Sequence, residues 1–422
     1  MGLPTQLSYG SMWFNPGMGT EPGFEWPATL DIAALTADGW NPVPFCEFII
    51  KIHSRCELAC DYCYMYEMAD QSWRDRPRCM SREIAEITAM RIGEHARAHR
   101  LTDVELILHG GEPLLAGREL ISYLVSAVRD AAGPEVNVRA SIQTNAVGLR
   151  GSFLRLFDEL GVRVGVSLDG VADDHDRHRR FASGRGSHEA VIAGLHRLTQ
   201  EPYRHLFSGL LCTIDLRNDP IVTYEALAAI EPPMVDFLLP HGTWESPPPG
   251  RVPGVTQTPY ADWLIRVFDH SYRSPKTRVR LFEEIMHLLL GGESGAEMVG
   301  LGPSRMLVIE TDGEIEQADT LKSAYPGAPQ TGLHVTKDPL DAALLLPGVA
   351  ARQLGERALA GACRGCRIRQ VCGGGLYAHR YRPGSGFANP TVYCPDMMRL
   401  IDHIRCAIDS DIDAWRAGRE AV

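Results

Sequence analysis

The sequence contains no apolar run that approaches the roughly 18 residues of a membrane-spanning helix. It also lacks a basic N-terminal stretch leading into an apolar one, so a secretory signal is not expected. Positive charge is in the minority, with 42 Lys and Arg against 53 Asp and Glu and a formal net charge of −11. Broad binding to nucleic acid backbones needs a clustered positive field. We therefore expect a cytosolic (cytoplasmic) protein whose partners include neither nucleic acids nor membranes.

Cysteine, in contrast, is plentiful, with 11 residues in a chain of 422. In a cytosolic protein these residues are expected to be metal ligands, reactive thiols or core residues before disulfides are considered. The length suits two or three domains, and 45% hydrophobic residues indicate an ordinary globular core. Composition excludes wholesale disorder and low-complexity repeats.

Apolar runs typical of buried parallel strands alternate with helical patterns through the middle of the chain. We expect strands at 48–52, 104–108, 136–142, 162–168, 206–214 and 234–239. Helices are expected at 82–98, 119–131, 152–160, 188–199 and 221–230. This alternation predicts an α/β fold with right-handed crossovers and a parallel sheet. Six strands indicate a partial (β/α)6 barrel, because a closed eight-stranded barrel needs two more units.

The pattern divides the chain into four segments. We expect an N-terminal lead-in, the partial barrel, a Pro-rich linker with bridging helices, and a smaller C-terminal domain, at 1–44, 45–240, 241–300 and 301–422. The C-terminal segment opens with MLVIETDGEIEQAD, a predicted hairpin with its turn at Asp312 and Gly313, and closes with a helix over 397–419. The lead-in residues Trp13, Trp26 and Trp40 are expected to cap the barrel.

The strongest motif is Cys-x3-Cys-x2-Cys, formed by Cys56, Cys60 and Cys63 directly after the first strand. Three thiolates on one loop can hold three irons of a [4Fe–4S] cube, which leaves the fourth iron open to chelate a substrate. The carboxyl end of a strand is where barrels and open sheets bind ligands. A zinc site with His53 as fourth ligand, or three core thiols, are the alternatives.

This loop, with Tyr62 before its last cysteine, resembles the signature of the radical S-adenosylmethionine (SAM) enzymes over about residues 45–240. Further motifs that resemble those of the family fall at successive strand ends, in His109–Pro113, Gln143–Asn145 and Ser167–Gly170. The resemblance implies an enzyme that cleaves SAM to a 5′-deoxyadenosyl radical, which abstracts a hydrogen atom. It implies a set of cofactor-binding residues: Tyr62, Gly110, Gly111, Glu112, Pro113, Gln143, Asn145, Ser167, Asp169, Arg179 and Arg180.

A second cysteine group near the C-terminus contains Cys363, Cys366, Cys372 and Cys394. Four cysteines satisfy either a structural zinc or a fully ligated [4Fe–4S] cluster. Downstream of a radical SAM core, the group resembles a SPASM extension. That pattern has seven cysteines and two auxiliary clusters, but this chain has Leu376 and Ala318 at two of the cysteine positions and no cysteine near Gly302. The resemblance therefore implies one auxiliary cluster, and two [4Fe–4S] clusters with SAM as the cofactors.

Asp319 lies where SPASM enzymes that resemble sulfatase maturases carry a proton-accepting aspartate. The resemblance implies a general base, and an ordinary polar residue at the end of a hairpin is the alternative. Among the remaining cysteines, Cys212 and Cys406 are expected to pack in the core, while Cys46 and Cys79 have no assigned role. His379 is expected to serve packing, with lining of a peptide channel as the alternative.

The segment from Cys363 to Cys394 resembles the FxsB-type branch of radical SAM/SPASM peptide maturases. That branch joins an aromatic ring carbon to the Cβ of a residue two positions on, which gives a three-residue cyclophane. The implied partners are a precursor peptide substrate and an external electron donor of the flavodoxin or ferredoxin type. The 44 residues before the first strand are too few for a winged-helix leader-binding domain. We expect leader recognition by the barrel and C-terminal surface, or by a separate leader-binding protein.

Other functions remain open at this point. Within enzymes, the alternatives are other oxidations of a peptide or protein side chain, such as thioether (sactionine-type) or formylglycine formation. Outside enzymes, a zinc-stabilised binding module is the alternative. The sequence does not identify the crosslinked residues, the reductant or the oligomeric state.

Overall fold

A computed structural model describes residues 25–252 and 254–420, with side chains as far as residue 417. Trp13 lies outside the described residues. The six expected strands are all present, as β1 (Glu47–His53), β2 (Asp103–Gly110), β3 (Asn137–Thr144), β4 (Val162–Ser167), β5 (Phe207–Thr213) and β6 (Met234–Leu238). Each pairs in parallel with the next, which confirms the α/β partial barrel.

The barrel sheet has more strands than the six expected. Within the described residues it has ten strands in the order β10-β9-β8-β1-β2-β3-β4-β5-β6-β7. The additional strands are β7 (Arg278–Val279), β8 (Met306–Ile309), β9 (Glu314–Glu316) and β10 (Gln330–His334). The predicted hairpin is confirmed as the antiparallel pair β8–β9, with Gly313 in its turn at φ 96°. Because β8 pairs in parallel with β1, this hairpin extends the barrel sheet.

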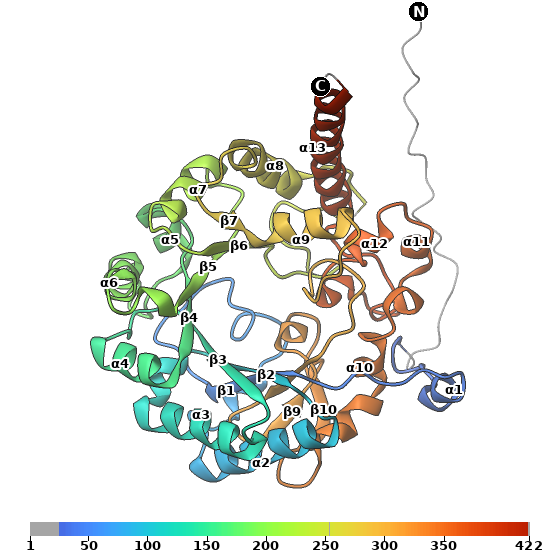
Figure 1. Cartoon of the computed structure of the whole chain (residues 1–422). Coiled ribbons are helices and arrows are strands. Elements are labelled where there is room, and N and C mark those ends of the chain that lie inside the picture. The colour runs from blue at the N-terminus through green and yellow to red at the C-terminus, as the bar shows by residue number, and fades with distance from the viewer. Residues whose placement is uncertain (1–24, 253, 421–422) are drawn as a thin grey trace, which may run out of the picture.

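Helices cover the outside of the curled sheet, and the loop after β1 crosses its interior (Figure 1). The barrel helices are α2 (Arg82–Ala98), α3 (Arg118–Ala132), α4 (Gly151–Leu160), α5 (Ala172–His178), α6 (His188–Thr199) and α7 (Pro220–Ala228). In α3, Ile121, Leu124, Val125 and Val128 are buried at helical spacing, so one apolar face packs on the sheet. Ser81 caps α2 by accepting a hydrogen bond from the Ile84 N–H. The short α5 has no counterpart among the predicted helices.

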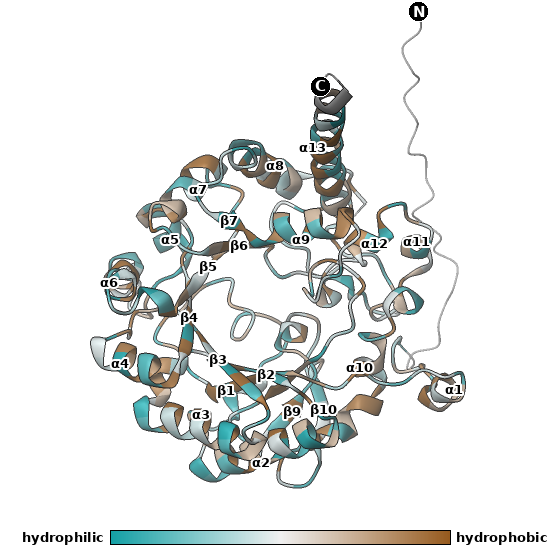
Figure 2. Cartoon of the chain, in the orientation of Figure 1, coloured by the Kyte–Doolittle hydropathy of each residue, from teal (hydrophilic) through white to brown (hydrophobic). Residues whose placement is uncertain are grey.

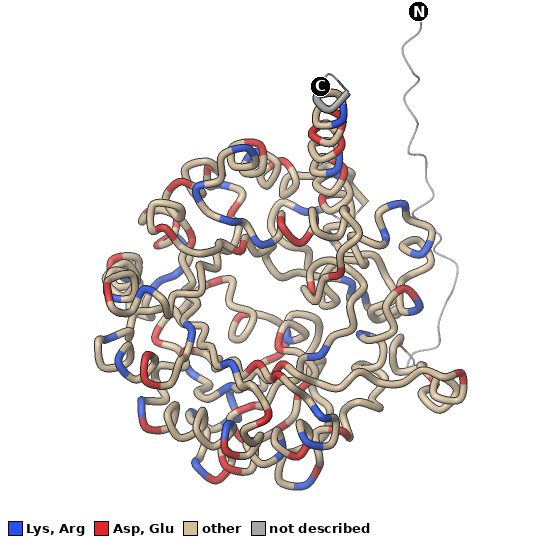
Figure 3. The backbone as a smooth tube through the Cα atoms, viewed as in Figure 1, with Lys and Arg blue, Asp and Glu red and all other residues tan. Residues whose placement is uncertain are grey.

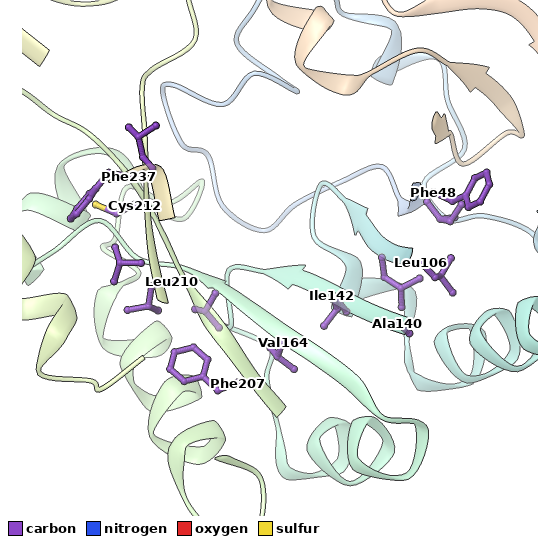
Figure 4. Close-up of a cluster of buried hydrophobic side chains, with 14 of the residues drawn as sticks. Phe48, Leu106, Ala140, Ile142, Val164, Phe207, Leu210, Cys212 and Phe237 are labelled. Atoms are coloured by element: carbon purple, nitrogen blue, oxygen red, sulfur yellow. The ribbon is translucent and has the colours of Figure 1, made fainter. Parts of the chain in front are cut away.

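The main core lies between the sheet and these helices, and Figure 2 shows brown apolar residues on both the strands and the helices. Figure 4 shows Phe48, Leu106, Val164 and Phe207 among the side chains of this layer. Cys212 belongs to it and is 1% exposed, which confirms its packing role. Cys406 is exposed on the surface of the C-terminal helix, so the expectation that it packs is wrong.

The C-terminal half adds short helices beside the barrel. Its elements are α8 (Pro259–Ser271), α9 (Arg280–Leu289), α10 (Pro347–Ala351), α11 (Gly361–Arg364), α12 (Arg369–Cys372) and α13 (Cys394–Glu420), while α1 (Ile32–Ala37) precedes the barrel. The helix α13 packs on α8, and the Asp396 carboxylate accepts hydrogen bonds from the first N–H groups of α8. Trp26 lies against Tyr377 of this half, with ring centroids 6.2 Å apart.

The distribution of charge and the apolar character of the helices bear on which partners the protein could bind. In Figure 3, Lys and Arg are interspersed with Asp and Glu around the outer helices. Across the described residues, none of the helices combines the length and apolar character needed to span a bilayer.

Candidate active site

The three cysteines of the first motif lie on the loop that leaves the carboxyl end of β1. The loop is folded on itself by a hydrogen bond from the Cys63 N–H to the Cys60 carbonyl, at 3.1 Å. The Sγ atom of Cys56 accepts from the Leu58 N–H at 3.4 Å and from the Asn145 amide at 3.6 Å. Burial raises the pKa of Cys56 and the Leu58 N–H offsets this only in part, so these donors orient the sulfur rather than ionise it.

Two glycines at the end of β2 allow that strand to approach the cysteine loop. A Cβ on Gly110 would overlap the His53 carbonyl, and a Cβ on Gly111 would overlap the Tyr66 hydroxyl and the Arg55 carbonyl. The Gly111 N–H donates to the His53 carbonyl at 2.8 Å. The resemblance-based assignment of Gly110 and Gly111 thus has a steric reason, because neither position has room for a side chain.

Glu112 connects the ends of β2 and β3. Its side chain is buried and accepts from the Thr144 hydroxyl at 2.7 Å, the Asn145 N–H at 2.9 Å and the Leu114 N–H at 3.0 Å. Burial, followed by the nearby charge of Glu57, raises the pKa of Glu112 to about 7. Glu112 therefore orders the wall beside Cys56 rather than offering a free carboxylate.

A second buried group joins the cysteine loop to the end of β4. The Tyr62 hydroxyl donates to the Asp169 carboxylate and accepts from Arg179 Nη1 at 2.9 Å. Asp169 also accepts from the Thr213 N–H on β5, at 3.0 Å. His175 on α5 accepts from the Asp169 N–H at Nδ1, and burial lowers the pKa of this imidazole to about 2. The unexpected helix α5 thus positions the Asp169 segment.

These groups surround a cavity of about 190 Å³ at the carboxyl ends of the strands. Most of the predicted site residues line it: Cys56, Cys60, Cys63, Tyr62, Gly110, Gly111, Glu112, Gln143, Asn145, Ser167 and Arg179. Gln143 donates to the Ser167 hydroxyl at 3.1 Å, so β3 and β4 are linked at the wall. Asp169 lines an adjoining cavity of about 580 Å³, which shares Tyr62 and His241 with the first.

Two predicted residues lie away from the cavity. Pro113 begins the 3₁₀ turn Pro113–Ala116 and is buried behind the wall. The Arg180 side chain is exposed and donates to the Asp176 carbonyl at 2.5 Å. Adjacent residues of an extended segment point in opposite directions, so only Arg179 of this pair faces inward. The structure thus places Arg179 at the cavity and Arg180 outside it.

Asp319 lies inside the barrel, where it forms an ion pair with Lys51 of β1. Lys51 Nζ is 2.6 Å from Asp319 Oδ2 and 3.0 Å from His109 Nδ1. The same carboxylate oxygen accepts from the Tyr64 hydroxyl at 2.6 Å. Although burial opposes ionisation, Lys51 holds the pKa of Asp319 well below its usual range. Asp319 is close to the cavity, since its partner Tyr64 and the Lys51 partner His109 both line it.

A buried ionic network fixes the segment that carries Asp319. Lys322, in the same 3₁₀ helix, pairs with Glu310 at 3.0 Å and Glu316 at 2.9 Å. Arg76 pairs with Glu316 at 2.8 Å from the other side. The network ties the β8–β9 hairpin to the loop before α2, so the position of Asp319 is set by charges as well as by the sheet.

The four C-terminal cysteines gather beside α12 and the start of α13. Burial, and then the neighbouring Cys372, Cys363 and Cys366 thiols, raises the pKa of Cys394 to about 12. These thiols therefore hold their protons until a metal centre binds, and binding would release the protons. Leu376 is buried in a separate apolar cluster and Ala318 is 1% exposed, so the two positions that lack cysteine are packed with apolar side chains.

The sulfur spacing bears on the choice between zinc and iron–sulfur. Throughout the described part of the chain, no three cysteine sulfurs lie within 4.8 Å of one another. A tetrahedral zinc with Zn–S bonds of about 2.3 Å would bring its sulfurs to about 3.8 Å. An iron–sulfide cube holds its thiolates on separate corners, further apart than the thiolates of a single zinc ion.

Sequence reasoning missed Lys51, Tyr64 and His241 as parts of this site, and it gave His109 no role beyond its place in the motif His109–Pro113. The signal for Lys51 was available, because a lysine in the middle of the apolar run FIIKI must be paired if it is buried. His241 lies in the irregular segment after β6, where no periodicity assigns a direction to its side chain.

Comparison with known proteins agrees with this geometry. Residues 50–217 match the Radical SAM superfamily. The chain is 25% identical over 375 residues to a serine-type anaerobic sulfatase-maturating enzyme of Klebsiella aerogenes, covering 84% of this chain and 87% of that protein. An uncharacterized protein of Synechocystis is 32% identical over 168 residues, but the match spans only 39% of this chain and 40% of that protein.

Two solved structures share the fold. One is anSMEcpe with bound AdoMet and the Cp18Cys peptide, with a TM-score of 0.72, 19% identity, and coverage of 87% of this chain and 99% of that one. The other is SuiB of Streptococcus suis bound to its precursor peptide SuiA, with a TM-score of 0.56, 14% identity, and coverage of 86% and 78%.

Residues 50–217 thus form a radical SAM domain, and the similarity of the longer chain to sulfatase-maturating enzymes indicates that the protein is an enzyme. Its cofactors are SAM and [4Fe–4S] clusters. The zinc-stabilised binding module is removed as an alternative.

Proposed function

We propose that this enzyme modifies a ribosomally made precursor peptide by joining an aromatic ring carbon to the Cβ of a nearby residue. The cavity that brings Cys56, Cys60 and Cys63 together with Arg179 carries the proposal. The wider cavity beside it offers room for a peptide segment. The resemblance of the segment from Cys363 to Cys394 to cyclophane-forming maturases selects the type of crosslink.

In this proposal, Cys56, Cys60 and Cys63 hold the SAM-binding cluster, and Cys363, Cys366, Cys372 and Cys394 hold one auxiliary cluster. When bound, the first cluster and SAM supply a 5′-deoxyadenosyl radical that removes a hydrogen atom from the peptide. The Asn145 amide orients Cys56, and the Arg179 guanidinium in the cavity wall is placed to bind the SAM carboxylate or ribose. Glu112 keeps the glycine backbone of β2 in place for the methionine amino group.

Asp319 is proposed to accept the proton that leaves the aromatic ring after the crosslink forms. Its ion pair with Lys51 keeps it as a carboxylate, the form that can take up a proton. A carboxylate with a lowered pKa is a weak base. A weak base is sufficient here, because a ring that has lost one electron while carrying an extra substituent is a strong acid.

Formylglycine formation is the second candidate, favoured by the relatives from Klebsiella aerogenes and Clostridium novyi that are named sulfatase-maturating enzymes. The two functions differ in product: formylglycine is a single oxidised residue, whereas a cyclophane links two residues. Thioether formation differs from both because it consumes a peptide cysteine.

The remaining partners are also proposals. An external donor of the flavodoxin or ferredoxin type would supply electrons in the cytosol. The leader of the precursor peptide would bind the barrel and C-terminal surface, or a separate leader-binding protein.

A deuterium-transfer experiment tests the proposal. The anaerobically reconstituted enzyme is incubated with SAM, dithionite and a precursor peptide that carries deuterium at one candidate Cβ. Deuterium recovered in 5′-deoxyadenosine would support Cβ hydrogen abstraction. Formation of 5′-deoxyadenosine without deuterium from any labelled position of the peptide would contradict the peptide substrate.

A further inference from the structure

Four aromatic rings pack one against the next between the two cysteine sets. The ring centroids of Tyr64 and His241 are 5.1 Å apart, those of His241 and His379 are 5.5 Å apart, and those of His379 and Tyr393 are 5.1 Å apart. We refer to these four residues as the aromatic column. Tyr64 follows Cys63 in the chain, and Tyr393 precedes Cys394. The column therefore leads from one cysteine set to the other.

The two ends of the column have different surroundings. Tyr64 and His241 line the cavity of the candidate active site. His379 and Tyr393 are completely buried behind it. Both tyrosine hydroxyls are fixed: Tyr64 donates to Asp319 at 2.6 Å, and Tyr393 donates to the Pro240 carbonyl at 2.6 Å. The column is thus a rigid path from the cavity wall into the interior.

His379 contributes its ring rather than a hydrogen bond. Neither of its ring nitrogens has a hydrogen-bond partner among the described residues, and the Nδ1 atom of His241 also has none. Burial lowers the pKa of both imidazoles, to about 4 for His241, so the column is uncharged near neutral pH. An unpaired buried polar atom opposes folding, so the two ring nitrogens of His379 do not account for its presence here.

Another group of aromatic rings lies in the C-terminal half, and it differs from the column. Tyr377, Phe387, Tyr381 and Tyr325 contact one another and Trp26. None of these residues lines the cavity. Among the described residues, the contacts of this group do not reach the cysteine loop after β1, whereas the column does.

We propose that the aromatic column conducts the electron that the peptide loses during crosslinking to the iron–sulfur cluster held by Cys363, Cys366, Cys372 and Cys394. The inference rests on the proposed function. After the Cβ radical has added to the aromatic ring, the ring-centred radical must lose one electron and one proton to become aromatic again. The electron reduces the oxidised auxiliary cluster by one unit, and the proton goes to Asp319. One C–C bond forms, and the ring C–H bond and the Cβ–H bond break.

Packed conjugated rings shorten the gaps across which an electron must tunnel, so removal of one ring should slow the transfer. His379 offers matched variants: His379→Leu removes the ring, whereas His379→Phe keeps a ring without nitrogens. Because the nitrogens are unpaired, His379→Phe is expected to unfold at a temperature equal to or above that of the original protein. His241→Leu is a second variant that interrupts the column, in case His379→Leu does not fold.

The test is performed without peptide, so that it does not depend on the substrate assignment. Both clusters are reduced with titanium(III) citrate, the reductant is removed, and SAM is added. The SAM-binding cluster is oxidised first, and the auxiliary cluster can then lose its electron only across the protein. The decay of its electron paramagnetic resonance signal is followed by freeze-quenching, with iron content and unfolding temperature measured for each variant.

We expect similar decay rates in the original protein and His379→Phe, and a rate slower by an order of magnitude or more in His379→Leu. Equal rates in all three proteins would overturn the proposal. So would slowing in His379→Phe that matches His379→Leu, because the nitrogens rather than the ring would then matter. If the peptide is not crosslinked but the rates follow the expected order, the column stands and the proposed function fails.

Discussion

Lys51 and Asp319, 268 positions apart in the chain, form a buried ion pair with an Nζ–Oδ2 distance of 2.6 Å. The pair joins the first strand of the barrel to the segment after the β8–β9 hairpin. Lys51 also reaches His109 at the cavity wall, at 3.0 Å. The ammonium group of Lys51 thus links the barrel interior to the C-terminal half at the active site.

Replacing Lys51 with Met should destabilise the protein strongly, because it leaves the Asp319 charge buried without its partner. The expected loss is about 3–5 kcal/mol in the free energy of unfolding. The double variant Lys51→Met with Asp319→Leu should recover part of this loss. Denaturant unfolding of the cluster-loaded protein measures both. If the double variant is no more stable than the single one, the two residues are not coupled as described.

Acidification should weaken the fold through His109. Burial, and then the charge of Lys51, lowers the pKa of His109 to about 4 from the ordinary value of 6.5. Between these values the unfolded chain binds a proton that the folded chain does not, so stability falls as the pH drops from about 6.5 towards 4. At higher pH the contribution is fully present.

The measurement is the free energy of unfolding across this pH range in the original protein and in His109→Gln. Gln offers an oxygen to Lys51 but does not titrate, so the stability of the variant should change less with pH. The difference between the two profiles should grow by roughly 1.4 kcal/mol for each pH unit below the ordinary pKa of histidine. His175 and His241 titrate in both proteins, so their contribution cancels in the difference. If the free energy of unfolding changes with pH in the same way in both proteins, His109 is not held neutral in the fold.

Glu112→Ala should both destabilise the protein and weaken SAM binding. The substitution leaves the Thr144 hydroxyl and the Asn145 and Leu114 N–H groups without their acceptor. Each unsatisfied group costs about 1–3 kcal/mol. Glu112→Gln retains one acceptor oxygen. Its stability and its SAM affinity should therefore lie between those of the original protein and those of Glu112→Ala. Unfolding and equilibrium dialysis of SAM check the order, and unchanged SAM affinity in Glu112→Ala would contradict the ordering role.

Arg179 and Arg180 form a matched pair for the cofactor site. Arg179 lines the cavity and bonds to Tyr62, whereas the exposed Arg180 donates to the Asp176 carbonyl. Arg179→Leu should therefore reduce SAM affinity by tenfold or more, the equivalent of about 1.4 kcal/mol, while Arg180→Leu should leave it unchanged. Equal losses of SAM affinity in the two variants would contradict the finding that Arg179 faces the cavity and Arg180 does not.

Much of the barrel could be predicted from the sequence, because each buried strand and its amphipathic helix is a local pattern. The cysteine loop was also predictable, since its spacing lies within eight residues. The parallel pairing of β8 with β1 was not, because nothing in the local periodicity of residues 306–309 selects a partner more than 250 positions away. The inward direction of Arg179 rather than Arg180 depends on the backbone after α5, a short helix rich in His and Asp that lacks an apolar face.

Removal of the C-terminal cysteine ligands should eliminate the auxiliary cluster and leave the SAM-binding cluster in place. The triple variant Cys363→Ala, Cys366→Ala and Cys372→Ala should bind about four irons instead of about eight. It should still cleave SAM, because the cavity residues are untouched. Iron and sulfide analysis provides the measurement, with zinc measured alongside. If the original protein contains one zinc ion that the triple variant lacks, the C-terminal cysteines hold a structural zinc ion and not an iron–sulfur cluster.

Tandem mass spectrometry of the reaction product tests the central claim most directly. The reconstituted enzyme is incubated anaerobically with SAM, dithionite and a candidate precursor peptide. We predict that the peptide loses two hydrogen atoms per ring, with fragmentation blocked across a three-residue segment that contains an aromatic residue. A peptide of unchanged mass in the presence of 5′-deoxyadenosine, or one whose mass change lies on a single residue, would contradict crosslink formation.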